Sequence, residues 1–288
     1  MKIGVALSGG GIRGLAHAGV LKALEENGIK IDIIGGTSAG SMVASLYSIG
    51  YTPDEIYKCF INNYSKIVGG RNFPFFFGVK KFINKGTGIN GLKKGENIET
   101  VFQQLAIGKN IDTISNIKMP IVIPTVDIKE AKEYIFTNNI PIGKEDNKKY
   151  ISEISIGKAV RASSSFPAVF NTCNIEKHAF IDGGALDNIP VEEVKKQGAD
   201  KVIAVKFEED KVDENSSMMD IVMRTIDIMG NKIAEKNIEK SDYVIKINTG
   251  RMGLLETKNI EKCFRFGYET VNENIEKIEE AIGKNKFT

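Results

Sequence analysis

The sequence is poor in the residues that hold metals or cross-link a chain. Its 288 residues include only two histidines (His17 and His178) and three cysteines (Cys59, Cys173 and Cys263). An odd number of widely spaced cysteines indicates reduced thiols rather than a disulfide framework. Because no pair of histidines or cysteines has the spacing of metal ligands, we expect neither a structural nor a catalytic zinc site.

Long apolar runs are missing as well. No stretch approaches the roughly 20 consecutive apolar residues of a membrane-spanning helix. The first residues, Met1–Leu7, are too few for the apolar core of a signal peptide and lead directly into glycines, so we interpret them as a strand. We therefore expect a cytoplasmic protein. The formal net charge of +2 neither favours nor excludes a nucleic-acid partner.

Apolar, β-branched runs alternate along the chain with amphipathic helical patterns, and no repeat or linker interrupts them. Strands are predicted over residues 2–7, 31–36, 120–127, 132–137, 179–184 (a short strand that leads Asp182 into a glycine turn), 201–207 and 243–247. Helices are predicted over 15–26, 53–65, 95–105, 154–164, 190–197, 218–240 and 261–282. A helix is also expected to begin at 41–47, and 138–149 to form a polar loop. This alternation predicts a single α/β domain over 1–288 with a mostly parallel central sheet.

The most informative stretch is residues 36–40, Gly-Thr-Ser-Ala-Gly, which follows a predicted strand and precedes a predicted helix. Strand, sharp turn and helix form the context of a nucleophile elbow. Side chains at Gly36 and Gly40 would crowd the strand and the helix. The turn would present the Ser38 hydroxyl at the positive end of the following helix. The alternative is a glycine-rich turn with an incidental serine.

A second glycine-rich segment, Ser8–Gly14, follows the first predicted strand and matches the dinucleotide-binding pattern Gly-x-Gly-x-x-Gly. That interpretation requires a ribose-binding acid at the end of the second strand, whereas Asp32 stands at its beginning. Backbone N–H groups at Gly10 and Gly11, unshielded by side chains, could instead point at a developing oxyanion. A plain phosphate-type turn remains the alternative.

A serine nucleophile needs a base, and no histidine follows Asp182 to complete the Ser-acid-His order of α/β-hydrolases. His178 stands at the far end of the strand that leads to Asp182, and we interpret it as an edge residue. We interpret His17 as a packing residue of the first helix. Asp182 is the best candidate for the base, because a strand end followed by glycines would let it approach Ser38.

Residues 56–95 contain no acidic side chain but hold eight basic and eight aromatic ones, interrupted by glycines. Such an insert is what contact with an anionic lipid surface would need, and we expect peripheral membrane contact here. Two alternatives remain open: a helical cap with phenylalanines in the core, or aromatic side chains that line an acyl pocket. Single-stranded nucleic acid uses the same residue types, but the motifs elsewhere make it a distant third, and we expect no nucleic-acid partner.

Four blocks together resemble the patatin-like phospholipase family, and we expect a bacterial member of it. They are Gly9-Gly10-Gly11-Ile12-Arg13-Gly14, Gly36-Thr37-Ser38-Ala39-Gly40, residues 162–170 (Ala-Ser-Ser-Ser-Phe-Pro-Ala-Val-Phe) and Asp182-Gly183-Gly184. The resemblance implies a three-layer α/β/α sandwich and a Ser38–Asp182 catalytic dyad that needs no metal or organic cofactor. It also implies an oxyanion hole in the first block, involving Gly9, Gly10, Gly11, Arg13 and Gly14, with Arg13 either bracing the loop or meeting a phosphate.

The implied activity is a serine acyl-ester hydrolase, a phospholipase A or lipid acyl hydrolase, whose partner is a phospholipid or another lipid ester. One alternative is a lipid-binding or regulatory protein with low turnover. Another is an acyltransferase or thioesterase that uses the same site. The intact serine, aspartate and glycine loop favour the hydrolase over the binding protein.

Overall fold

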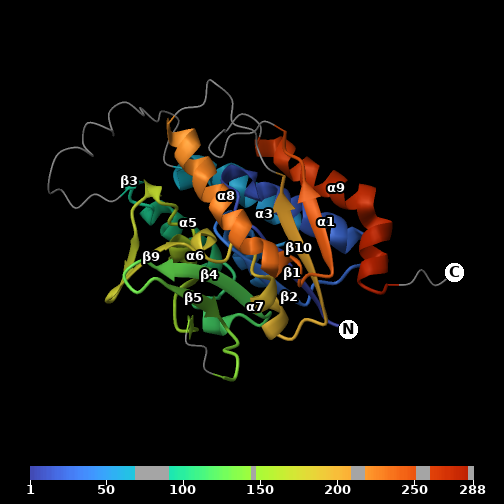
Figure 1. Cartoon of the computed structure of the whole chain (residues 1–288), viewed down its shortest axis with the longest axis horizontal. Helices are drawn as coiled ribbons and strands as arrows, with labels where there is room; N and C mark the ends of the chain where they lie inside the picture. Colours follow the sequence, from blue (N-terminus) through green and yellow to red (C-terminus); the bar gives the residue numbers. More distant parts are fainter. Residues whose placement is uncertain (69–90, 144–146, 209–217, 251–259, 285–288) are drawn as a thin grey trace.

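The computed structural model describes residues 1–68, 91–143, 147–208, 218–250 and 260–284 (Figure 1). Its main sheet has the strand order β11-β10-β1-β2-β4-β5-β6, and a hairpin of β8 and β9 joins it through β4. The strands are β1 (Ile3–Leu7), β2 (Ile33–Gly36), β4 (Ile121–Asp127), β5 (Lys132–Thr137), β6 (Lys148–Ile151), β8 (Cys173–Ile175), β9 (His178–Asp182), β10 (Lys201–Phe207) and β11 (Tyr243–Ile247). A separate parallel pair consists of β3 (Gly91–Lys93) and β7 (Ala168–Phe170).

The centre of the sheet is parallel and apolar. β1 lies between β2 and β10 and runs parallel to both. All five residues of β1 are buried, as expected for a strand with helices on both faces. Since parallel strands end at the same edge of a sheet, the segments that follow β1 and β2 emerge side by side.

β2 and β9 pair with the same edge of β4, one beyond the other. β2 runs parallel to the start of β4, where Gly35 pairs with Val122. Further along β4, on the edge that β5 does not occupy, β9 runs antiparallel and Asp182 pairs with Thr125. Because the two strands run toward each other, the carboxyl end of β2 faces the carboxyl end of β9.

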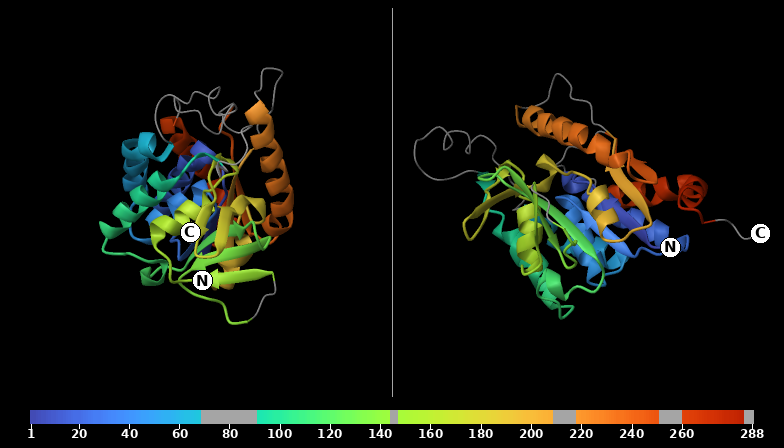
Figure 2. Two further views of the ribbon diagram at one scale, coloured as in Figure 1. Left: turned by 90° about the vertical axis from the view of Figure 1, so that its left-hand side faces the viewer. Right: turned by 60° about the horizontal axis from the view of Figure 1, so that its bottom comes forward.

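Helices cover both faces of the sheet, which gives the three layers expected from the sequence (Figures 1 and 2). One face carries α1 (Leu15–Glu26), α2 (Ala39–Ser48), α3 (Pro53–Val68), α5 (Glu96–Ile107), α6 (Ile156–Ser163) and α9 (Ile260–Ala281). The other carries α7 (Val191–Lys196) and α8 (Met218–Ile238). Short 3-10 turns lie at η1 (Gly11–Gly14), η2 (Ile114–Asn116) and η3 (Gly183–Ala185). Among the described helices, none combines the length and apolar character needed to cross a bilayer.

The long elements confirm the sequence predictions to within two or three residues at each end. β9 ends at Asp182 and the two glycines begin η3, which confirms the prediction of a strand that leads Asp182 into a glycine turn. The loop predicted over 138–149 was wrong at its end, since β6 begins at Lys148. The short strands β3, β7 and β8 were not predicted, because three residues are too few to show a periodic pattern. Of the basic, aromatic insert at 56–95, residues 69–90 lie outside the described part.

Helices α1 and α9 cross with their backbones in direct contact. A Cβ atom added to Gly267 would lie 1.9 Å from the carbonyl oxygen of Ala16, and one added to Gly19 would lie 1.9 Å from that of Phe264. The two glycines therefore face each other's helix at the point of closest approach. Any side chain at either position would force the helices apart.

We expect Gly267→Ala to lower the free energy of unfolding by about 1–3 kcal/mol, the usual penalty for overpacking a tight contact. Gly108→Ala is the matched control, because Gly108 has an ordinary φ of −60° and its added Cβ would lie 3.3 Å from the nearest atom. Urea unfolding of both variants measures the difference. Equal stabilities would contradict the close helix contact.

Candidate active site

Ser38 stands at a strained turn between β2 and α2. Its backbone has φ 53° and ψ −119°, a region that residues other than glycine rarely occupy. A Cβ at Gly36 would lie 2.3 Å from the carbonyl oxygen of Gly40, and a Cβ at Gly40 would lie 2.5 Å from that of Leu7. The steric expectation for both glycines is thus confirmed, because a side chain at either position would collide with the backbone of this tight turn.

Neighbouring hydroxyl groups hold the backbone of Ser38 in this conformation. The Ser38 N–H donates to Ser163 Oγ at 3.1 Å. The Ser38 carbonyl oxygen accepts from Ser164 Oγ at 3.2 Å and from Ser41 Oγ at 2.6 Å. The sequence did not reveal these hydrogen bonds, because they depend on where α6 ends.

Asp182 is the last residue of β9 and is 3% exposed. Its backbone N–H donates to the carbonyl oxygen of Ser165 at 3.1 Å, and its Oδ1 accepts from the Gly184 N–H at 2.9 Å. A Cβ at Gly183 would lie 2.3 Å from the carbonyl oxygen of Pro124, so the turn after Asp182 packs closely on β4. These contacts hold the carboxyl group at the end of β9 that faces the elbow.

The glycine-rich loop lies against the same turn. Gly10 and Gly11 line the cavity that contains Ser38, and Gly11 has φ 58°, which favours glycine. The Gly9 N–H donates to Asn188 Oδ1 at 3.1 Å. A Cβ at Gly14 would lie 2.5 Å from that of Ala39, so the loop rests on the start of α2.

The buried side chain of Arg13 braces this loop. The side chain is 4% exposed, and its Nε donates to the Gly10 carbonyl oxygen at 3.2 Å. Its guanidinium group also lies 5.0 Å from the ring centroid of Phe207. Of the two roles considered for Arg13, these contacts match the bracing one.

Asn188 was missed in the sequence and connects the two halves of the site. It lies six residues after Asp182, and its side chain also donates from Nδ2 to Asn231 Oδ1 at 3.2 Å. The residue therefore joins the turn after β9 to the glycine loop and to α8. An asparagine close to an Asp-Gly-Gly turn was the one signal available, and it is too common in loops to be decisive.

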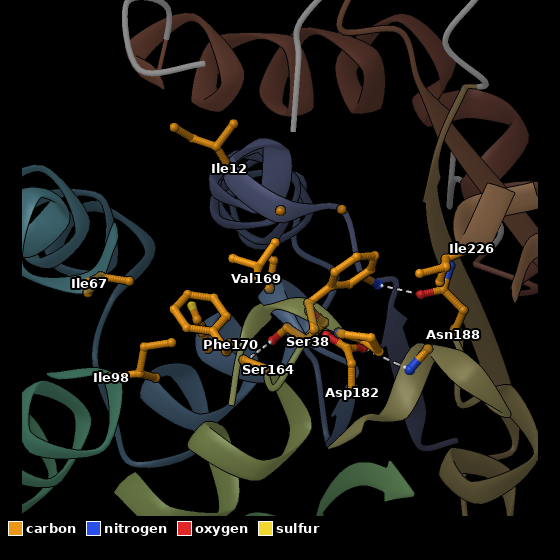
Figure 3. A pocket seen from close by; sticks show the side chains of 18 of the residues that line it. Ile12, Ser38, Ile67, Ile98, Ser164, Val169, Phe170, Asp182, Asn188 and Ile226 are labelled. Atoms are coloured by element: carbon orange, nitrogen blue, oxygen red, sulfur yellow. Dashed lines mark hydrogen bonds between the residues drawn. The ribbon is translucent and has the colours of Figure 1, made fainter. Parts of the chain in front are cut away.

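Ser38 and Asp182 open into one cavity of about 130 Å³ (Figure 3). Figure 3 shows Ile67, Ile98 and Phe170 on one side of the pair, and Asn188 with Ile226 on the other. Phe60 and Tyr64 of α3 also line the cavity, so the described part of the 56–95 insert supports the interpretation in which aromatic side chains face inward. Lys93 adds an ammonium group to the wall, and burial lowers its pKa.

Both histidines lie outside this cavity. His17 is fully buried and donates from Nε2 to the Ser8 carbonyl oxygen at 2.8 Å, and its ring lies tilted against that of Phe207. Burial lowers the pKa of His17 to about 4, so the ring is neutral at neutral pH. His178 begins β9, at the opposite end from Asp182. The described cavity lining thus contains one carboxyl group, that of Asp182, and no histidine.

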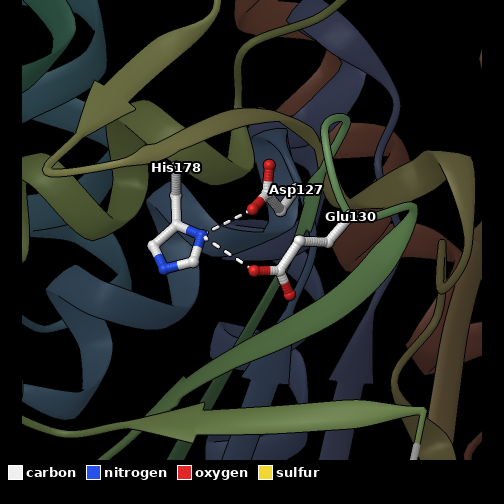
Figure 4. Close-up of side chains that lie close together, drawn as sticks. All are labelled: Asp127, Glu130 and His178. Atoms are coloured by element: carbon white, nitrogen blue, oxygen red, sulfur yellow. Dashed lines mark hydrogen bonds and ion pairs between the residues drawn. The ribbon is translucent and has the colours of Figure 1, made fainter.

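His178 belongs to a cluster of three potential metal ligands, with Asp127 and Glu130 (Figure 4). His178 Nδ1 donates to Asp127 Oδ2 at 2.5 Å, and Lys149 Nζ lies 2.7 Å from Glu130 Oε2. Asp127 Oδ1 accepts from the backbone N–H groups of Lys129 and Ala179. The cluster therefore ties the β4–β5 turn to the start of β9 through its own hydrogen bonds.

Comparisons with known proteins identify the family to which this chain is similar. A family model described as patatin-like phospholipase matches residues 5–195. The protein named Lysophospholipase NTE1 of Meyerozyma guilliermondii is 32% identical over 211 residues, which covers 70% of this chain and 12% of that protein. The one of Candida albicans is 33% identical over 218 residues, covering 70% and 13%. The chain therefore spans about an eighth of the length of these relatives.

Solved structures with a similar fold include VipD from Legionella pneumophila. It has a TM-score of 0.54 at 16% identity, over 96% of this chain and 67% of VipD. ExoU, solved with SpcU from Pseudomonas aeruginosa, has a TM-score of 0.50 at 16% identity, over 96% and 52%. At these identities the likeness concerns the fold alone, which is α/β with a mostly parallel central sheet.

We expect Ser163→Ala to lower the free energy of unfolding by about 1–3 kcal/mol, because it removes the acceptor of a partly buried backbone N–H. Ser45→Ala is the control, since the Ser45 hydroxyl is equally buried but donates only to the Met42 carbonyl oxygen within α2. Thermal and urea unfolding of the two variants test this. A Ser163→Ala protein as stable as the control would show that the elbow does not depend on this hydrogen bond.

Proposed function

The chain belongs to the patatin-like phospholipase family, and we propose from this and from the site that it is a serine acyl-ester hydrolase acting on lipid esters. The observation that carries the proposal is the meeting of Ser38 and Asp182, from distant segments, in one largely apolar cavity. Ser38 is the proposed nucleophile and Asp182 the proposed base.

In the proposed reaction, Asp182 takes the hydroxyl proton as Ser38 Oγ attacks the ester carbonyl carbon. The resulting oxyanion accepts hydrogen bonds from the N–H groups of Gly10 and Gly11, each donor contributing about 3–4 kcal/mol in comparable sites. The proton then passes to the leaving alkoxide, the ester C–O bond breaks, and an acyl-Ser38 ester remains. Water, deprotonated by Asp182, releases the acid. Asp182 and the loop supply the proton transfer and charge stabilisation without a cofactor.

The cavity supports a lipid substrate. Isoleucine, valine and phenylalanine side chains from α3, α5, β7 and α8 line it, and such a surface favours an acyl chain over a polar group. The relatives named lysophospholipases also support a phospholipid or lysophospholipid as substrate. A phospholipase A activity is therefore the form of the proposal that we favour.

We expect Ser38→Ala to abolish hydrolysis of aryl esters and phospholipids and to abolish labelling by a fluorophosphonate probe. Asp182→Asn should lower kcat by about 10²–10⁴-fold, the usual effect of losing a general base. His178→Ala is the control and should keep most of the activity, because its side chain lies outside the cavity.

Folded protein is confirmed by circular dichroism for each variant before turnover is compared. Full turnover by Ser38→Ala would refute the proposal, and an inactive but folded His178→Ala protein would refute the Ser-Asp dyad. Probe labelling without turnover of any ester would indicate a lipid-binding or regulatory protein. Transfer of the acyl group to an added alcohol or thiol would indicate an acyltransferase.

The proposal includes peripheral contact of the 56–95 insert with anionic lipid. We expect the protein to bind vesicles containing phosphatidylserine, and we expect this binding to weaken between about 0.05 and 0.5 M salt, because salt screens exposed charges. Co-sedimentation with charged and neutral vesicles measures it. Binding that depends on neither salt nor lipid charge would contradict this contact. It would indicate that the insert packs in the core or lines an acyl pocket.

A further inference from the structure

A buried group of charged side chains lies behind the turn that follows Asp182. Asp187 is 1% exposed, and Glu133 of β5, Glu193 of α7 and Lys148 of β6 surround it. Lys148 Nζ lies 3.1 Å from Glu133 Oε2 and 2.7 Å from Glu193 Oε1. The group therefore connects β5, β6 and α7 to the turn that follows Asp182 in the proposed active site.

Among the residues that the structure describes, the carboxyl groups of this cluster outnumber the cations that face them. Glu193 is well satisfied, since it accepts hydrogen bonds from Lys148 and Lys196 and from the Tyr150 hydroxyl. Two lysines thus balance two of the three carboxylates. The third negative charge would be buried and uncompensated, which is unfavourable by several kcal/mol unless a proton neutralises it.

Two buried carboxyl oxygen atoms indicate which side chains share this proton. Glu133 Oε1 and Asp187 Oδ2 are buried, and no donor among the described residues reaches either. Asp187 Oδ1 accepts from Asn237 Nδ2 of α8 at 3.3 Å. Burial raises the pKa of Glu133, and a side-chain hydrogen bond with the Asp187 carboxyl group opposes this rise. A single proton on one of the two carboxyl groups would supply the missing donor and satisfy both oxygens.

The electrostatic surroundings favour this protonated state. Burial raises the pKa of Asp187 well above its ordinary value, and the charges of Glu133 and Glu193 raise it further against the opposing effect of Lys148. Burial also raises the pKa of Glu133. A carboxyl pair in which one member stays protonated is the usual result when two acids share a buried site.

The backbone of Asp187 links this group to the proposed catalytic residues. Its N–H donates to the Gly183 carbonyl oxygen at 2.9 Å, and its carbonyl oxygen accepts from Thr37 Oγ1 at 2.8 Å. Thr37 precedes Ser38, Gly183 follows Asp182, and Asn188, which holds Gly9, comes next in the chain. A displacement of Asp187 would therefore move both members of the dyad and the glycine loop.

We propose that Asp187 is a positioning residue, which holds the turn 182–188 against the elbow by sharing a proton with Glu133. The link to catalysis rests on the proposed function, whereas the shared proton does not. When the proton is lost as pH rises, two adjacent buried carboxylates repel each other, and the turn that carries Asp182 loosens.

The pH dependence of stability follows from the same proton. In the unfolded chain both carboxyl groups lose their protons near pH 4, but the folded protein keeps one to a higher pH. Between these two values the folded state binds more protons, so its stability decreases as pH rises. The unfolding equilibrium constant should rise up to tenfold per pH unit in this range because of this one proton. Asp187→Asn, which is neutral at every pH, removes that contribution.

The decisive experiment compares wild type, Asp187→Asn and Asp187→Ala between pH 5 and 9.5, with Asp200→Asn as a control for an exposed carboxylate. Urea unfolding, hydrogen exchange of the amides of residues 183–188, and kcat/KM on an aryl ester are measured at each pH. If Asp187→Asn does not fold, Glu133→Gln, which neutralises the other member of the pair, takes its place.

We expect the wild type and Asp200→Asn to lose stability, protection of the turn amides and kcat/KM together as pH rises. Asp187→Asn should keep all three at alkaline pH and match the wild type near pH 6, whereas Asp187→Ala should be at least tenfold less active throughout. A wild-type stability slope in Asp187→Asn would refute the shared proton. An unchanged alkaline loss of turn protection would refute the positioning role. Both readouts need no substrate, so a failure of the proposed hydrolase activity is recognised separately, by Ser38→Ala.

Discussion

The backbone conformation of Ser38 is the constraint on which the rest of the site depends. A non-glycine residue at φ 53° and ψ −119° persists only where its surroundings allow no alternative. Gly36 and Gly40 permit the close contact of β2 with α2, and hydroxyl groups from α2 and α6 satisfy the Ser38 backbone. These contacts maintain the strained conformation, and its result is a serine hydroxyl that opens into a cavity rather than into the core.

The second half of the site is positioned by the path of the chain around β4. β2 and β9 pair with the same edge of β4 and run toward each other. Asp182, at the end of β9, therefore lies near the turn that follows β2. The six residues that follow Asp182 contact several separate parts of the fold. Gly183 packs on β4, Asp187 connects to the buried charges, and Asn188 holds the glycine loop. The proposed base, the nucleophile and the oxyanion loop therefore form one mechanical unit, and a change in any of these contacts would affect all three.

Much of this could be predicted from the sequence, for identifiable reasons. The long helices and buried strands have clear periodicity, and their bounds were close to those observed. Glycines at 36 and 40 were predicted from sterics, because a Cβ in a tight turn has nowhere to go whatever the remainder of the fold. The family resemblance joined Ser38 to Asp182, but it said nothing about Asn188 or Asp187. Their roles depend on neighbours that are distant in sequence, such as Gly9, Glu133 and Asn237.

The sequence by itself determined the α/β alternation, the strained serine turn, and the absence of a histidine after the acidic residue. These are local properties, set by side-chain size and spacing along a few residues. Only the tertiary structure decided that Arg13 braces its loop, that aromatic residues of α3 face a cavity, and that Asp187 is buried beside Glu133. Burial and charge balance are sums over residues from many segments, so they exist only once the chain has brought those segments together.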